Sequence, residues 1–398
     1  MKAVVLAGGQ ELTRCPLSMV RPRPLLPLVT GVLLDQVLET LLSADVDEAI
    51  ICANGKTHVF REHFRTKPIQ RMRLGFHDEG LPLGTAGCLR DVAGRLGDGA
   101  FLVIEAGLFI DGELGGLVDD HRKSGAALTI GAVPVHEWSG GDGTGEHCDR
   151  LSPVGAYIVD TEALQHVPAD SYFDIKEQLI PRLRDKRLRV RASRYRGRHR
   201  RIGDARAYFA LIQEMLAGAL GRRLFDGLKE TAPQVWVAED AEVDASATLV
   251  GPIAVGSRAV IGKGAVITGP SLIGEGVVVG ERAFVSHSVL WPGAQIGYGA
   301  SVEHAIVTDS FRVRPSARVA HCVAVDQDLR LGDLRGLRLG GYAVVSQGSL
   351  GSNVAGAAST KSALSRLWQA LMTMRHGEEI PLTRAGGDST TAPDQEQR

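Results

Sequence analysis

The sequence has no apolar run long enough to cross a membrane. Its first residues, MKAVVLAGG, hold an apolar stretch far shorter than a signal peptide requires, and no later segment approaches the roughly 20 apolar residues of a spanning helix. An excess of one charge is also missing, since 45 Lys and Arg balance 46 Asp and Glu. The balance gives no electrostatic reason to bind nucleic acid or an acidic membrane. We expect a soluble, cytoplasmic protein that binds neither.

Cysteine is scarce and has no pairing pattern. The five cysteines include no CxxC spacing, and an odd number cannot all form disulfides within one chain. We therefore predict reduced thiols. Cys52 and Cys88 lie in apolar sequence and are expected to be buried, whereas Cys15 lies beside a glycine-rich stretch and is the one candidate for a reactive thiol.

The first half of the chain alternates strand and helix patterns. This alternation predicts a mainly parallel sheet with helices on both faces, in which the ligand lies at the carboxyl ends of the strands. The paired Gly8 and Gly9 follow the first expected strand, and the stretch from Glu105 to Gly107 closes another. The expected strands are 2–7, 48–54 and 100–107, and the expected helices are 33–42 and 84–96.

From about Pro233 the sequence repeats with a period of six. An aliphatic residue stands at every sixth position, and glycine often follows it, as in VGSRAV and IGKGAV. Such a period is typical of a stacked β-helix, because each short strand buries one side chain inside the coil and glycine permits the corner. The unbroken series is Val237, Val243, Leu249, Val255, Ile261, Ile267, Ile273, Val279 and Val285.

The repeat changes phase near Trp291 and resumes at Ile296. His287, His304 and His321 each fall two residues after an aliphatic position of the repeat, which predicts that they stack on successive coils. We interpret them as an exposed polar column rather than a metal site. Residues spaced one coil apart rarely point their nitrogens at a common centre.

Two motifs in the first half resemble those of a known family. LAGGQELTRCPLSMVRPRPLLPL, from Leu6 to Leu28, resembles LAGGxGTRLxPLTxxxPKPLLPV, and LPLGTAGCL, from Leu81 to Leu89, resembles LGTAGAL. These patterns belong to sugar-1-phosphate nucleotidylyltransferases of the GDP-mannose or glucose-1-phosphate pyrophosphorylase type. Weaker similarities, FLVIEAGLFID, SPVGAYIVD and RRIGDARAYF, follow in the family's order.

The resemblance implies an α/β fold with a Rossmann-like nucleotidyltransferase domain followed by a left-handed parallel β-helix of hexapeptide repeats. Large flat sides of a β-helix imply a homo-oligomer, or a complex with an active paralogue through the β-helix. The expected parts are a nucleotidyltransferase-like domain over 1–215, a helical linker over 216–232, the β-helix over 233–345, and a connector, amphipathic helix (361–374) and disordered tail over 346–398.

In this family a sugar-1-phosphate attacks the α-phosphorus of a nucleoside triphosphate. The reaction needs cationic side chains and a magnesium ion held by carboxylates. The resemblance places Gly155 and Arg201 on the sugar-phosphate side and leaves Arg14 and Arg23 as candidate catalytic cations. The nucleotide-binding positions that it implies are Ala7, Gly8, Gly9, Gln10, Leu83, Gly84, Thr85, Ala86 and Gly87.

Several working positions of the family are altered. Gly107 and Arg201 stand where the family has its magnesium-binding carboxylates, so magnesium is expected from the family but its ligands are missing and no metal ligand is assigned. Glu11 and Thr13 stand where the glycine loop has glycine and arginine. The nearest substitute carboxylates, each offset from a ligand position, are Glu105, Asp111 and Asp204.

These losses predict a protein that binds a nucleotide or nucleotide sugar, is catalytically impaired, and acts as a regulatory or scaffold subunit. The Arg201 guanidinium could neutralise a diphosphate without magnesium. Two alternatives stay open: an active mannose-1-phosphate guanylyltransferase or glucose-1-phosphate nucleotidylyltransferase with an atypical metal site, and a hexapeptide-repeat acyltransferase. For Gly87, a turn that needs small residues explains the motif equally well. The arginine-rich stretch 182–201 is interpreted as a strand edge guarded by charge, apart from Arg201.

Overall fold

A computed structural model gives the fold of most of the chain. The structure describes residues 1–8, 17–80, 82–135, 150–169, 171–218, 220, 225–325, 338–339, 342–346 and 354–355. The described residues belong to one compact unit, 1–356. Residues 357–398, which include the predicted amphipathic helix, lie outside the described residues. None of the described helices is long and apolar enough to span a membrane.

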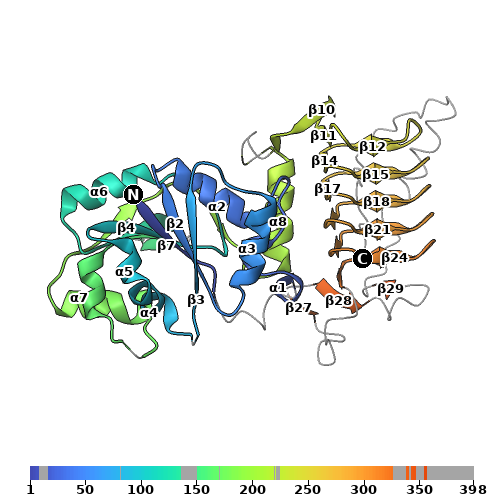
Figure 1. Cartoon of the computed structure of the whole chain (residues 1–398). Coiled ribbons are helices and arrows are strands. Elements are labelled where there is room, and N and C mark those ends of the chain that lie inside the picture. Colours follow the sequence, from blue (N-terminus) through green and yellow to red (C-terminus); the bar gives the residue numbers. More distant parts are fainter. Residues whose placement is uncertain are drawn as a thin grey trace, which may run out of the picture. The chain divides into compact units, whose positions relative to one another are not determined.

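The first part of the chain forms a seven-stranded sheet (Figure 1). Its order is β3-β2-β1-β4-β7-β6-β8, and only β7 runs antiparallel to its neighbours. The predicted mainly parallel sheet is therefore confirmed. The strands are β1 (Lys2–Leu6), β2 (Glu48–Ala53), β3 (Arg73–Asp78), β4 (Ala100–Glu105), β6 (Leu128–Val135), β7 (Arg150–Asp160) and β8 (Val190–Arg194).

Helices cover both faces of this sheet because its strands are apolar on both sides. Ala3 and Val5 of β1 belong to one buried cluster with α2, α3 and α6, while Val4 and Leu6 belong to another with α4, α5 and α7. Cys52 and Cys88 are buried in the second cluster, as predicted. The helices are α1 (Leu17–Val20), α2 (Leu33–Leu42), α3 (Thr57–Thr66), α4 (Gly84–Asp91), α5 (Ala93–Leu96), α6 (Gly115–Ser124), α7 (Ile180–Asp185) and α8 (Ala205–Leu216), with short turns η1 (Arg23–Leu25), η2 (Thr161–His166) and η3 (Ile175–Leu179).

The arginine-rich stretch 182–201 comprises the end of α7 and two strands. β8 is the last strand of the sheet, and Arg189, Arg191 and Arg194 are exposed there, so the predicted charged edge is observed. β9 (Arg196–Arg201) instead pairs with β5 (Leu108–Glu113) in a separate antiparallel ribbon. That pairing places Arg201 opposite Leu108, three residues beyond the last residue of β4.

The segment after α8 differs from the expectation. A helical linker over 216–232 was predicted, but α8 ends at Leu216 and residues 228–232 form a strand, β10 (Leu228–Ala232). β10 pairs antiparallel with β11 (Val235–Ala238), the first strand of the next domain. Without β10, the outer edge of β11 would have unpaired N–H and C=O groups, and β10 forms hydrogen bonds with that edge.

Residues from 235 form a parallel β-helix built from three sheets. Val237 pairs with Val255, and Val255 pairs with Ile273, each eighteen positions on, so three repeats make one coil. Seven of the nine aliphatic residues of the repeat lie in the buried cluster inside the coil, and Leu249 packs against that cluster. Val243, in the first coil, is the exception and is 36% exposed. One sheet holds β11, β14 (Ile253–Val255), β17 (Ser271–Ile273), β20 (Val289–Leu290), β23 (Ile306–Val307), β26 (Cys322–Val325), β28 (Tyr342–Ser346) and β27 (Arg338–Leu339); the second holds β12 (Glu242–Val243), β15 (Val260–Ile261), β18 (Val278–Val279), β21 (Gln295–Ile296) and β24 (Arg312–Val313); the third holds β13 (Thr248–Val250), β16 (Val266–Thr268), β19 (Phe284–Ser286), β22 (Ser301–Glu303), β25 (Arg318–Ala320) and β29 (Val354–Ala355).

The phase change lies at His287, four positions before Trp291. Earlier coils turn the corresponding corner with a dipeptide such as Gly269–Pro270, whereas later coils use a single histidine in the left-handed conformation. Ile273 therefore pairs with Leu290, only seventeen positions on. The predicted stacking is confirmed: neighbouring rings lie 4.7 Å and 5.0 Å apart between centroids, in the column His287, His304 and His321.

The histidine column is less exposed than predicted. His287 and His304 are half-buried, and only His321 is exposed. Burial lowers the pKa of His287 and of His304, and the two neighbouring imidazoles lower that of His304 further. Among the residues described, no group of three or more His, Cys, Asp or Glu side chains is arranged to hold a metal ion.

Helix α8 packs against the β-helix (Figure 1). Tyr208 of α8 and Trp291 are both fully buried, and their rings meet edge to face at 6.0 Å. The Trp291 Nε1–H donates to the Tyr208 hydroxyl over 3.0 Å, and that hydroxyl donates to the Pro27 carbonyl over 2.7 Å. A buried polar chain thus connects the β-helix to the segment that follows η1.

Candidate functional site

A pocket of about 460 Å³ opens beside the carboxyl ends of β1, β2 and β4. This is the side of a parallel sheet where ligands are expected. The pocket collects residues that are far apart in the sequence, from the loop after β1, η1, α4 and the end of β9. Its lining comprises Leu6, Ala7, Gly8, Ser18, Pro22, Arg23, Pro24, Ala53, Asn54, Lys56, Phe60, Pro82, Thr85, Glu105, Gly107 and Arg201.

Five of the predicted site residues line this pocket: Ala7, Gly8, Thr85, Arg23 and Arg201. Leu83, Gly84, Ala86, Gly87 and Gly155 lie next to lining residues in sequence or in space but do not line it themselves. The remaining candidates, Gly9, Gln10 and Arg14, lie outside the described residues, together with Glu11, Thr13 and Cys15.

The backbone amides at the start of the glycine loop are already used. Both Ala7 and Gly8 donate their N–H to the Cys52 carbonyl, over 2.8 Å and 3.0 Å. A Cβ on Gly8 would lie 2.9 Å from the Asn54 side-chain oxygen, so a larger residue there would have to displace the Asn54 side chain. Ala7 and Gly8 therefore shape the wall of the pocket, and their amides are directed into the sheet.

The GTAG segment at the start of α4 packs against the chain around Phe173. The Phe173 carbonyl accepts the N–H groups of Ala86 and Gly87, and a Cβ on Gly84, whose φ is +79°, would lie 2.6 Å from the same oxygen. A Cβ on Gly87 would meet Leu83 at 2.8 Å. Tight packing is thus a sufficient reason for both glycines. For Gly87 this agrees with the alternative given from the sequence, that a turn there needs small residues.

Thr85 is the member of that segment that reaches the pocket. Its hydroxyl donates to Asp174 and accepts the Ile175 N–H, each over 2.8 Å. Asp174 in turn accepts from the amide of Lys176 and begins η3. The bonds of Thr85 tie α4 to η3, and η3 carries a cation to the edge of the pocket.

Glu105 forms a charged cluster at the end of β4. Its carboxylate lies 2.6 Å from the Arg201 guanidinium and 3.0 Å from the Lys176 ammonium, and it accepts from the Tyr157 hydroxyl over 3.2 Å. Burial alone would raise the pKa of Glu105, but the charges of Lys176 and Arg201 outweigh burial and lower it. Glu105 is a counter-ion for two cations in this arrangement.

The other two substitute carboxylates lie away from the pocket lining. Asp204 caps the start of α8 by accepting the Ala207 N–H over 2.7 Å. Asp111 faces Arg198 across the β5–β9 ribbon. Of the three candidates proposed from the sequence, only Glu105 lines the pocket.

Arg23 lies over Gly107. The Arg23 side chain is only 6% exposed, and a Cβ on Gly107 would lie 2.8 Å from its Cδ. A carboxylate side chain at 107 could not be added without moving Arg23. The second altered position, Arg201, lies beside Gly155, where an added Cβ would be 3.5 Å from its guanidinium and where φ is +82°. Guanidinium groups therefore occupy both regions in which the family pattern calls for a carboxylate.

The described lining carries three cations, Arg23, Lys56 and Arg201, and one carboxylate, Glu105. Such a balance favours an anionic ligand. Sequence reasoning missed Asn54, Lys56 and Lys176, which reach the site from the loop after β2 and from η3. No motif or spacing marks these residues, because only the folded sheet brings them to the pocket.

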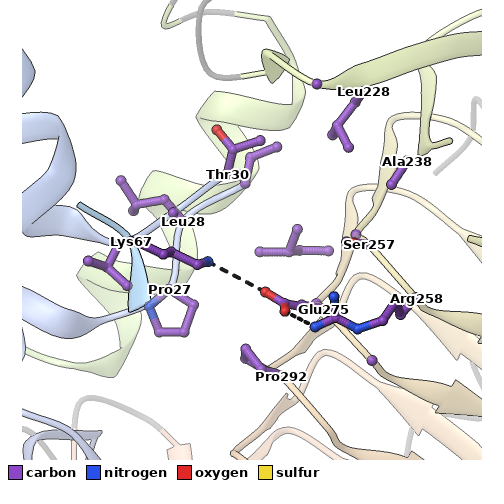
Figure 2. Close-up of a pocket in the computed structure, with 18 of the residues that line it drawn as sticks. Pro27, Leu28, Thr30, Lys67, Leu228, Ala238, Ser257, Arg258, Glu275 and Pro292 are labelled. Atoms are coloured by element: carbon purple, nitrogen blue, oxygen red, sulfur yellow. Dashed lines mark hydrogen bonds and ion pairs between the residues drawn. The ribbon is translucent and has the colours of Figure 1, made fainter. Parts of the chain in front are cut away.

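A larger cavity of about 810 Å³ lies between the segment 27–32 and the corners of the first β-helix coils (Figure 2). Glu275 accepts from Arg258 there, and its other oxygen lies 3.5 Å from the Lys67 ammonium. The lining holds charges of both signs in similar number, including Asp226, Glu239 and Asp240. The cavity has no net preference for an anion, so the smaller pocket is the better candidate for a phosphate-bearing ligand.

Comparisons with known proteins agree with this geometry. Residues 2–140 match the Nucleotidyl transferase family, and residues 249–354 match the GMPPB C-terminal domain. A mannose-1-phosphate guanylyltransferase of Mycobacterium tuberculosis is 25% identical over 201 residues, which cover 46% of this chain and 55% of that protein. A putative mannose-1-phosphate guanyltransferase of Sulfolobus acidocaldarius is 25% identical over 279 residues, or 66% and 73% of the two chains.

A UTP–glucose-1-phosphate uridylyltransferase of Synechocystis is 24% identical over 287 residues, covering 64% of this chain and 74% of the relative. Other relatives are matched over a smaller share; a guanylyltransferase catalytic subunit of Dictyostelium discoideum is covered to 39%. The two family matches follow the order of the two domains along the chain. The first match begins in the domain built on the seven-stranded sheet, which holds the pocket, and the second lies in the β-helix. Residues 2–140 thus match the Nucleotidyl transferase family, and the chain as a whole is similar to sugar-1-phosphate nucleotidyltransferases of the mannose-1-phosphate guanylyltransferase type.

Proposed function

We propose that the protein binds a nucleotide or nucleotide sugar in the pocket beside β1 and β4 without turning it over at an ordinary rate. In this role it is a regulatory or scaffold subunit of nucleotide-sugar metabolism. The observation that carries the proposal is the position of Arg23, whose side chain lies over Gly107 where the family pattern has a carboxylate. Arg201 supplies a second guanidinium at the other altered position.

The physical reason is a change in how phosphate charge is neutralised. Nucleotidyl transfer relies on a metal ion that neutralises charge as it develops and orients the leaving group. Guanidinium groups can hold a diphosphate through charge-assisted hydrogen bonds. They cannot replace magnesium in gathering phosphate oxygens into a fixed octahedral geometry. A pocket that neutralises phosphate with arginines can therefore bind a nucleotide sugar, the product of the family's reaction. Arginines do not supply the metal ion that the reaction itself needs.

Arg201 is the group best placed to exchange partners. Its guanidinium is half exposed and bonds to Glu105, which keeps Lys176 as a second partner when Arg201 leaves. A diphosphate entering the pocket could therefore take Arg201 without stranding the carboxylate. Most of the similar proteins named above act on mannose-1-phosphate, so GDP-mannose is the first ligand to test.

One observation supports the alternative of an active enzyme with an atypical metal site. Glu105 lines the pocket, and release from Arg201 and Lys176 would free its carboxylate to bind magnesium. The two functions differ in a simple assay. An active transferase releases pyrophosphate from GTP and mannose-1-phosphate, or from another matched pair, in the presence of magnesium.

The test combines turnover with binding. Pyrophosphate release is followed for GTP, ATP, UTP and dTTP with mannose-1-phosphate or glucose-1-phosphate, and the Mycobacterium tuberculosis relative serves as the positive control. Calorimetry then measures GDP-mannose binding to the wild type, to Arg201→Gln and to Arg198→Gln, an exposed arginine on the same strand. We expect no release by this protein, and binding that Arg201→Gln weakens about 10- to 100-fold, the loss of one charge-assisted bond. Arg198→Gln should bind normally.

Turnover at an ordinary rate would overturn the proposal in favour of the active enzyme. Absence of any nucleotide or nucleotide-sugar binding would overturn it in favour of a purely structural subunit. The proposed regulatory role also needs a partner, and we propose that the β-helix supplies the contact surface, either for a second copy or for an active paralogue. Light scattering of the protein alone and with such a paralogue tests that part separately.

A further inference from the structure

One short segment joins the nucleotide pocket to the β-helix. Pro22, Arg23 and Pro24 line the pocket. On one side of them, the Arg21 guanidinium donates to the Asp309 carboxylate of the β-helix. On the other side, the Pro27 carbonyl accepts from the Tyr208 hydroxyl, which accepts from Trp291 of the β-helix. Both ends of the segment 21–27 are therefore anchored to the β-helix while its middle forms the pocket.

The segment is stiff between its anchors. Proline fixes φ at positions 22 and 24, and it restricts Arg21, the residue before Pro22, to extended conformations. A tight turn follows, closed by bonds from the Leu25 N–H to the Pro22 carbonyl and from the Leu26 N–H to the Arg23 carbonyl, of 2.8 Å and 3.1 Å. A displacement at Arg21 is passed on to Arg23, because few backbone torsions between them can absorb it.

Asp309 is held in an unusual setting for a surface ion pair. Its side chain is 23% exposed, and the second carboxylate oxygen is buried without a hydrogen-bond partner among the described residues. Burial raises the pKa of Asp309, and the neighbouring Arg21 opposes that rise. A buried charge needs its partner, so the contact with Arg21 is a specific one.

We propose that Asp309 is a positioning residue for the nucleotide pocket, which acts on Arg23 through Arg21. The inference rests on the proposed function, since Arg23 is the group that the pocket offers to a phosphate. It gives the β-helix a direct influence on ligand binding, although no β-helix residue lines the described pocket. Any partner that shifts the coil carrying Asp309 would change the affinity for the ligand.

A second ion pair between the same two domains provides a matched control. Lys67, just beyond α3, lies 3.5 Å from Glu275 of the β-helix. A dashed line marks this ion pair in Figure 2. This pair joins the domains as the Arg21–Asp309 pair does, but it lies outside the segment 21–27. The Lys67–Glu275 pair is the more exposed of the two, and Glu275 also bonds to Arg258. Its removal therefore tests the loss of an interdomain contact outside the segment 21–27, and only Asp309→Asn should affect the pocket.

The test compares Asp309→Asn with Glu275→Gln. Calorimetry with GDP-mannose should show binding about 3- to 10-fold weaker in Asp309→Asn, a typical energy of coupling between sites, and unchanged binding in Glu275→Gln. In an Arg23→Gln background, Asp309→Asn should have no further effect, because it acts through Arg23. Equal effects of the two single variants, or additive effects of Asp309→Asn and Arg23→Gln, would overturn the inference.

A second measurement does not depend on any ligand. The peptide amides of Leu25 and Leu26 close the turn after Arg23, so hydrogen exchange there reports how firmly the segment is held. Exchange should be faster in Asp309→Asn than in Glu275→Gln and the wild type. Unchanged exchange would refute the positioning role. Should the wild type bind no nucleotide, the proposed function fails while the exchange comparison still decides whether Asp309 positions the segment.

Discussion

The hydroxyl of Tyr208 is the most informative single group between the two domains. In Tyr208→Phe the ring stays in its buried place beside Trp291, but the Trp291 N–H loses its acceptor and the Pro27 carbonyl loses its donor. Leaving a buried polar group without a partner costs about 1–3 kcal/mol, so the loss of partners for these two groups should lower the free energy of unfolding by about 2–6 kcal/mol.

Tyr195 offers a matched control, because its hydroxyl is buried without a hydrogen-bond partner in the part of the chain described. Its removal in Tyr195→Phe should leave stability unchanged or raise it by about 1 kcal/mol. Urea unfolding followed by tryptophan fluorescence measures both variants against the wild type. Equal stability of Tyr208→Phe and Tyr195→Phe would refute the account of the buried polar chain between α8, Pro27 and the β-helix.

Three further predictions follow from local geometry. Gly84→Ala should destabilise the protein by about 2 kcal/mol or more in urea unfolding, since φ is +79° and the new Cβ would lie 2.6 Å from the Phe173 carbonyl. Gly94→Ala, where an added Cβ meets nothing within 4 Å, should be neutral or stabilising by about 0.5–1 kcal/mol, and the reverse order of these two variants would contradict the packing of α4. Because the pKa values of His287 and His304 are lowered on folding, the unfolded chain binds more protons below the ordinary value of 6.5, and stability should fall on acidification through that range. Thermal melting from pH 8 to 5 should show a smaller loss in His304→Asn, whose side chain tolerates the left-handed backbone; an identical loss would exclude the histidine column as its cause.

The features predicted from the sequence are those that depend on local pattern. Val4 and Val5 are buried on opposite faces of one strand, so a continuous apolar run predicts a strand covered on both sides. The six-residue repeat predicts the β-helix because each repeat contributes the same interior position. The histidine stack follows from the same spacing, since equal positions on successive coils lie directly above one another.

Features that depend on distant contacts could not be predicted. β10 forms because the edge of β11 is open, and nothing within 228–232 favours a strand over a helix strongly enough to show it. The placement of Arg23 over Gly107 joins residues from different parts of the fold, and sequence alone showed only that each departs from the family pattern. Lys176 reaches Glu105 because η3 is tied to α4 by Thr85, a tertiary arrangement without a sequence signal.

The exposure of the histidine column was also misjudged for a tertiary reason. A single left-handed residue replaces a Gly-Pro dipeptide at that corner, and the imidazole then lies against the rings of neighbouring coils. Stacking removes water from the inner faces of His287 and His304. Spacing along the sequence predicted the column but contained no information on how tightly its rings would pack.

The magnesium dependence of ligand affinity tests the central claim most directly. Calorimetry of GDP-mannose, GDP and GTP is performed with an excess of EDTA and again with magnesium, and the dissociation constants are compared. If Arg23 and Arg201 neutralise the phosphates, the dissociation constant of the best ligand should be the same within about 2-fold in the two conditions. Binding that appears only with magnesium, or that tightens about 10-fold or more with it, would contradict the account and would identify a metal site in a pocket that we interpret as metal-independent.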